Sequence, residues 1–177
     1  MGQNTGGAGC AVEGRNLCGG RAAGERQQAE ITPARAALPL DGGGGAVFLE
    51  ADGAKRLPCK APAGHEPVLL PESDIVLAVA GLSAVGQPLQ KVCFRLGTAC
   101  VLLGTTPDTP LTPHLLAKLL ADRVGGRKNV NDRPFFAVLN QADTPQRRAY
   151  GEETQKILQT QYAVRSILTA FEEGERG

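Results

Sequence analysis

Acidic and basic side chains gather in a short stretch of the chain, directly after an apolar run. Glu50 and Asp52 lie two residues apart, so on an extended backbone they point to the same side. Hard divalent cations bind carboxylate oxygens and bridge to phosphates, which makes Glu50 and Asp52 candidate catalytic residues and Asp52 a candidate metal ligand. Gly53, Lys55 and Lys60 are candidates for holding an anion. The alternative interpretation is that the carboxylates pair with these cations and only stabilise the loop.

A histidine and a carboxylate are neighbours further along the same stretch. His65 and Glu66 lie in a proline-rich loop. A His–Glu pair can serve acid–base or metal chemistry, which makes His65 the third candidate catalytic residue. The alternative is that the pair only stabilises the loop.

A second polar motif follows an apolar run near the C-terminus. Asn140-Gln141-Ala142-Asp143 approximates the Asn-Lys-x-Asp signature with which GTPases recognise guanine, with Gln141 in place of the lysine. In that arrangement the Asn and Asp side chains hydrogen-bond the base, so Asn140 and Asp143 are candidate nucleotide-binding residues. The alternative is local: Asn140 ends a strand, and Asp143 helps Thr144 to cap the next helix.

Apolar runs and helical periodicities predict the elements that position these residues. Strands are predicted at residues 46–49, 74–80, 134–139 and 162–168, and helices at residues 89–103, 112–124 and 144–160. Thr112-Pro113 and Thr144-Pro145 are typical of an N-cap followed by proline in the first helical turn.

This alternation predicts an α/β fold in three layers, with a mostly parallel sheet and helices on both faces. Ligands of such sheets bind beyond the carboxyl ends of the strands. Residues 50–53 and 140–143 both fall at predicted strand ends, so we expect them to face one ligand site.

Composition predicts two segments and excludes some partners. Residues 1–45 are Gly-rich and form a poorly ordered N-terminal segment in this interpretation, with a short helix at 27–37, while residues 46–177 form the α/β domain. The charges nearly cancel, with 19 Lys and Arg against 18 Asp and Glu, so we expect no nucleic-acid partner. No apolar run approaches the roughly 20 residues of a membrane span, so we expect no membrane partner.

The cysteines indicate a reducing compartment. There are five of them, without regular spacing, which fits free thiols in the cytoplasm better than a disulfide framework. Cys93 and Cys100 are predicted to be buried positions of the helix at 89–103.

The stretch 47–90 as a whole resembles the central block of the YqeC family. The resemblance rests on Glu-Ala-Asp-Gly-Ala-Lys at 50–55 and on Lys-Ala-Pro-Ala-Gly-His-Glu-Pro at 60–67, and it extends more loosely from Val47 to the C-terminus. The family is described as accessory to selenium-dependent molybdenum hydroxylases. The resemblance therefore implies a cytoplasmic maturation factor whose partners are such a hydroxylase or its cofactor-maturation proteins.

The resemblance also implies a P-loop NTPase-like fold that binds GTP or ATP with Mg²⁺. This sequence departs from that pattern, because Gly14 and Gly19 have the glycine spacing of a phosphate-binding loop but Gly20 and Arg21 stand where Lys and Ser or Thr are required. The fold is thus predicted to be incomplete at its N-terminus. An unpaired strand edge would follow, and with it self-association.

Three functions are consistent with these features. The first is the maturation factor, either as an NTPase-like enzyme or by delivering a cofactor component. The second is a binding module without turnover, which the missing phosphate loop favours. The third is an enzyme that acts on a small anionic or nucleotide-sugar-like substrate through Glu50, Asp52 and His65.

Overall fold

The computed structural model describes residues 47–171 of the 177-residue chain. All of them except Val47 belong to one unit, Phe48–Gly177. The predicted helix at 27–37, the glycine spacing at 14–19 and the predicted N-terminal segment lie outside the described residues. No helix within the described range is long and apolar enough to cross a membrane.

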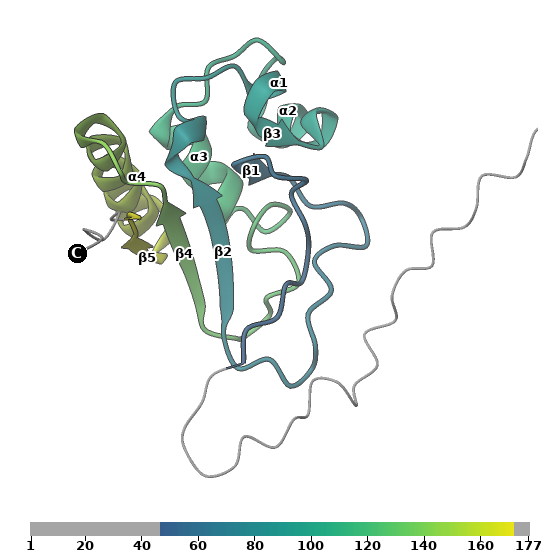
Figure 1. Cartoon of the computed structure of the whole chain (residues 1–177). Coiled ribbons are helices and arrows are strands. Elements are labelled where there is room, and N and C mark those ends of the chain that lie inside the picture. Colours follow the sequence, from purple (N-terminus) through teal and green to yellow (C-terminus); the bar gives the residue numbers. More distant parts are fainter. Residues whose placement is uncertain (1–46, 172–177) are drawn as a thin grey trace, which may run out of the picture. The chain divides into compact units, whose positions relative to one another are not determined.

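Three parallel strands form the main sheet. They are β2 (Val76–Gly81), β4 (Phe135–Asn140) and β5 (Arg165–Leu168), in the order β2-β4-β5 (Figure 1). β2 and β4 coincide with apolar runs that predicted strands, and β5 lies within the strand predicted at residues 162–168. The α/β class and the parallel pairing are confirmed.

The two crossover helices begin where the Thr-Pro pairs predict. In α3 (Pro113–Ala121) the Thr112 hydroxyl accepts a hydrogen bond from the Leu115 N–H at 3.2 Å. In α4 (Pro145–Tyr162) the Thr144 hydroxyl accepts one from the Arg147 N–H, also at 3.2 Å. Both helices carry proline in their first turn, where its missing N–H costs nothing.

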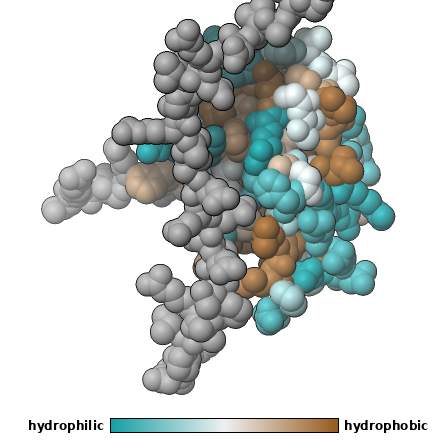
Figure 2. Space-filling view, turned by 90° about the vertical axis from the view of Figure 1, so that its right-hand side faces the viewer, coloured by the Kyte–Doolittle hydropathy of each residue, from teal (hydrophilic) through white to brown (hydrophobic). Residues whose placement is uncertain are grey.

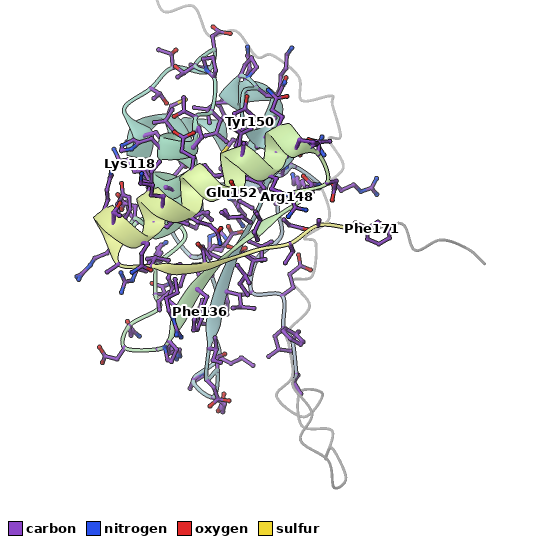
Figure 3. All side chains as sticks on the ribbon, turned by 90° about the vertical axis from the view of Figure 1, so that its left-hand side faces the viewer. Lys118, Phe136, Arg148, Tyr150, Glu152 and Phe171 are labelled. Carbon is purple, nitrogen blue, oxygen red and sulfur yellow. The ribbon has the colours of Figure 1, made fainter. Side chains whose placement is uncertain are left out.

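Helices α3 and α4 pack on one face of the sheet, and in residues 47–171 the other face carries no helical layer. Ala80 and Leu139 are buried in the core with the two helices. On the opposite face Leu77, Val79 and Ile167 are 41%, 60% and 51% exposed. Figure 3 shows this division, with α4 on one side of β5 and Phe136 on the other.

The sequence predicts helices on both faces of the sheet, and the strand order explains why α3 and α4 lie on one face. Right-handed crossovers that step through β2, β4 and β5 in one direction place both helices on the same face. Only a strand order that reverses direction puts helices on the second face.

The strand predicted at residues 46–49 is not formed. Val47, Phe48 and Leu49 are extended coil and are 57%, 81% and 49% exposed. The outer edge of β2 instead lies next to the segment that leads into β1. At this edge the Gly81 N–H donates a hydrogen bond to the Pro58 carbonyl at 2.7 Å.

The helix predicted at residues 89–103 is interrupted. It is replaced by α1 (Leu89–Val92), the short strand β3 (Cys93–Phe94) and α2 (Leu96–Leu103). Arg95 breaks the helix because its φ of 63° is left-handed. Cys93 is therefore a strand residue, whereas Gly104 ends α2 as predicted, with a φ of 68°.

Strand β3 pairs in parallel with β1 (Cys59–Lys60), which lies in the long loop before β2. This loop and β1 lie on the right-hand side of the molecule in Figure 1. Figure 2 views that side and shows apolar patches separated by hydrophilic residues. The small β1–β3 sheet brings the polar block at 50–67 against the segment that follows α1.

Candidate functional site

Lys60, at the end of β1, is the centre of a charged cluster. Its Nζ lies 3.1 Å from Asp52 Oδ2 and 2.8 Å from Glu66 Oε2. The same nitrogen donates a hydrogen bond to the Gly53 carbonyl at 3.1 Å. The Lys60 side chain is 12% exposed, so the ammonium group exchanges most of its water for these three oxygens.

Glu66 joins the loop to the segment after β3. Arg95 Nη2 donates to Glu66 Oε1 at 2.6 Å and Arg95 Nε to Glu66 Oε2 at 3.3 Å, while the Ala63 N–H donates to Oε2 at 3.2 Å. Burial opposes ionisation of this carboxyl. The hydrogen bonds from Lys60, Arg95 and Ala63 outweigh that effect and lower the pKa of Glu66 from 4.5 to about 2.

Three cations surround the aromatic ring of Phe94. Lys55 Nζ is 5.1 Å from the ring centroid, Lys60 Nζ 6.0 Å and Arg95 Cζ 4.8 Å. Cations within about 6 Å of an aromatic face are attracted by its quadrupole. The ring thus holds Lys55 beside the cluster, although Lys55 forms no ion pair with any residue in the described range.

We call Asp52, Lys55, Lys60, Glu66 and Arg95 the β1–β3 cluster. It contains three cations and two carboxylates, and its one uncompensated charge is the exposed ammonium group of Lys55. Such an arrangement can attract an anion to Lys55, with the rest of the cluster fixing the surrounding loop.

His65 and Glu50, the other candidate residues predicted in this stretch, lie outside the β1–β3 cluster. His65 has a 66% exposed side chain, and its Nε2 is 3.9 Å from Glu66 Oε1. Glu50 is exposed, and within residues 47–171 it takes part in no ion pair. The described range also contains no group of three or more His, Cys, Asp or Glu side chains that could hold a metal ion.

Sequence reasoning missed part of the cluster. Glu66 was considered only as the neighbour of His65, and Arg95 and Phe94 were hidden inside a predicted helix. Residues 50–60 contain more cations than carboxylates, and this excess predicts a further acidic partner such as Glu66.

Asn140 is the last residue of β4, and Asp143 lies three residues beyond it, as predicted. Both side chains form hydrogen bonds with nearby segments of the chain. Asn140 Oδ1 accepts hydrogen bonds from the Gln141 N–H at 2.8 Å and the Thr169 hydroxyl at 3.0 Å. Asp143 Oδ1 accepts from the Phe171 N–H at 2.8 Å. These bonds connect the end of β4 to the segment after β5. Among the described residues, no hydrogen bond or ion pair joins Asn140 or Asp143 to the β1–β3 cluster.

A cleft of about 400 Å³ lies at the carboxyl ends of the main strands. Its lining includes Ser83, Gly86, Gln87, Thr144, Arg147 and Tyr150, so the segment after β2 and the first turns of α4 form its walls. Figure 3 shows Tyr150 on α4. This is the place where parallel α/β sheets bind ligands, and no residue of the β1–β3 cluster lines it.

Parallel strands joined by α3 and α4 define an α/β domain, and the β1–β3 cluster gives it a candidate anion-binding site. The model of the YqeC family, described as YqeC protein, matches residues 7–97, just over half of the chain. The chain belongs to the YqeC family. All five residues of the cluster lie within the matched range.

A relative of known sequence is the uncharacterized protein YqeC of Escherichia coli (strain K12). It is 34% identical to this chain over 85 residues, which make up 48% of this chain and 33% of the relative. The match thus spans about a third of the relative's length. No solved structure matches the chain.

Proposed function

We propose that this chain is a cytoplasmic accessory factor in the maturation of a selenium-dependent molybdenum hydroxylase. In this role it binds a phosphate-bearing cofactor component, such as a nucleotide, and presents it to the hydroxylase or to its cofactor-maturation proteins. The observation that carries the proposal is the β1–β3 cluster, in which Lys60 and Arg95 pair with the two carboxylates and the charge of Lys55 is left uncompensated. The free thiols of the chain suit a reducing compartment.

In the proposed complex, Lys55 meets the phosphate oxygens first because its ammonium group is exposed and unpaired within the described range. Lys60 keeps Asp52 and the Gly53 carbonyl in place. A Mg²⁺ ion arriving with GTP or ATP would bring phosphate oxygens as ligands and take Asp52 as a protein ligand. In this proposal Glu50 and His65, which flank the segment in the sequence, act on the bound component.

A second candidate function is a binding module without turnover. It is favoured by the pairing of Lys60 and Arg95 with Asp52 and Glu66, which leaves neither carboxylate free to act as a base. Hydrolysis of ATP or GTP by the purified chain, abolished by Asp52→Ala, would exclude this candidate. The enzyme acting on a small anionic substrate through Glu50, Asp52 and His65 is a third candidate and predicts the same loss with a non-nucleotide substrate.

The role is tested by genetic complementation. The gene is deleted in its own organism, molybdenum hydroxylase activity is assayed under selenium-replete growth, and the strain is complemented with the wild-type, Lys55→Gln or Lys156→Gln chain. Lys156 is an exposed residue of α4 and serves as the matched control. We expect the deletion and Lys55→Gln to lower activity, while Lys156→Gln restores it. Unchanged activity in the deletion strain would refute the role.

A further inference from the structure

Two cysteines face each other across the β1–β3 pair. The register of the parallel strands places Cys59 directly opposite Cys93. Each is only 3% exposed, and neither takes part in the charged cluster. Neighbouring strands lie about 4.8 Å apart, which falls within the usual Cα separation of about 4.4 to 6.8 Å for disulfide-bonded cysteines. The backbone therefore places the two Cα atoms at a separation that a disulfide can span.

The two thiols are chemically unequal. The neighbouring Cys59 side chain lowers the pKa of Cys93 against the opposing effect of burial. The same contact, together with burial, raises the pKa of Cys59. Each thiol donates its hydrogen bond to a backbone carbonyl: Cys59 Sγ to Val92 at 3.3 Å and Cys93 Sγ to Phe94 at 3.6 Å. Cys93 is thus the better nucleophile, and Cys59 is placed to attack second.

We propose that Cys59 and Cys93 are a redox modification site that forms a reversible intramolecular disulfide by exchange with a small-molecule disulfide such as oxidised glutathione. The Cys93 thiolate attacks one sulfur of the glutathione disulfide, which forms a mixed disulfide and releases one glutathione thiolate. Cys59 then loses its proton and attacks the Cys93 sulfur, which releases the second glutathione thiolate. The two cysteine protons end on the two glutathiones, so two thiols are oxidised and one disulfide is reduced.

The fold gives the oxidant a route to the buried pair. Each of the two strands is only two residues long, and one further backbone bond, from the Ala61 N–H to the Phe94 carbonyl at 3.1 Å, extends their pairing. So short a ladder opens more easily than the main sheet.

The disulfide would act on the charged cluster through the chain. Lys60 follows Cys59, while Phe94 and Arg95 follow Cys93. A disulfide would therefore hold the segment that carries Lys60 close to the segment that carries Arg95. The chemical proposal does not depend on what the cluster binds, and its test needs no ligand.

Peptide mapping of the full chain tests the proposal. The reduced protein is incubated with oxidised glutathione, alkylated and digested with trypsin without reduction. Cleavage after Arg56, Lys60, Lys91 and Arg95 isolates each cysteine in its own peptide, 57–60 and 92–95. We expect the two peptides to appear as one disulfide-linked species that disappears on reduction. Cys100 in peptide 96–118 reports independently whether the oxidant reacts with a more accessible thiol.

Two variants test the order of attack. Cys59→Ser is expected to accumulate the glutathione adduct on Cys93, because the second thiol is gone. Cys93→Ser is expected to leave Cys59 unmodified. The proposal is overturned if wild-type Cys59 and Cys93 remain thiols while Cys100 reacts, if each carries its own glutathione, or if either bonds to another cysteine instead.

Discussion

Replacing Glu66 with glutamine should destabilise the chain in a way that depends on pH. Glu66 accepts hydrogen bonds from Lys60 and Arg95, and its pKa is lowered from 4.5 to about 2. A shift of this size corresponds to about 3 kcal/mol of stability at neutral pH. This is an upper value, because solvent still reaches 14% of the side chain. We expect Glu66→Gln to lower the free energy of unfolding by about 2 to 3 kcal/mol at pH 7.

The sign of the pH dependence follows from the lowered pKa. The contribution of Glu66 is fully present above pH 4.5, the ordinary value, and is lost as the pH falls through about 2. Urea unfolding followed by circular dichroism suits a chain without tryptophan and gives the free energy at each pH. The difference in the free energy of unfolding between wild type and Glu66→Gln should therefore decrease steadily as the pH falls from 4.5 to about 2.

A matched control separates this effect from a general loss of charge. Glu152 is an exposed residue of α4, as Figure 3 shows, and Glu152→Gln should change stability by no more than about 0.5 kcal/mol. The reasoning is refuted if Glu66→Gln and Glu152→Gln unfold at the same urea concentration at pH 7, or if the gap for Glu66→Gln does not change with pH.

Three further substitutions probe the sheet and its helices. If the chain self-associates through the open face of β2, as we expect, Val79→Lys should reduce the association, whereas Gln159→Lys on α4 should not. Sedimentation velocity distinguishes the two variants. Gly151→Ala should cost about 1 to 3 kcal/mol in a urea titration, because an added methyl group would overlap Leu168. Thr144→Ala should lower the stability by about 1 kcal/mol through loss of the α4 cap, visible as a lower melting temperature.

The parts of the fold that the sequence predicts correctly are those with strong local signals. An apolar run is enough to locate β2 and β4, and a Thr-Pro pair is enough to locate the start of α3 and of α4. These signals operate within a few residues, so they do not depend on how the rest of the chain is arranged.

The errors arise where distant contacts decide the local structure. Residues 89–103 have a helical pattern, but Arg95 adopts a left-handed conformation while its guanidinium group pairs with Glu66. Residues 46–49 have the composition of a strand, yet Val47, Phe48 and Leu49 form none and remain largely exposed. Neither outcome can be read from a short window of sequence.

The candidate site divides in the same way. Asp52, Gly53, Lys55 and Lys60 are brought together, as expected of residues so close in sequence. Pairing of β1 with β3 is what adds Arg95, and sequence spacing does not reveal that pairing. Asn140 and Asp143 lie at the predicted strand end, where local hydrogen bonds occupy both side chains.

Equilibrium dialysis against GTP and ATP in the presence of Mg²⁺, with inorganic triphosphate as a third probe, tests the central claim most directly. The claim is that the β1–β3 cluster binds a phosphate-bearing ligand through Lys55. Loss of one charged contact is worth about 1.5 kcal/mol, so Lys55→Gln should weaken binding about tenfold, while Lys156→Gln leaves it unchanged. Absence of binding to all three probes, or equal affinities for the two variants, would contradict the claim.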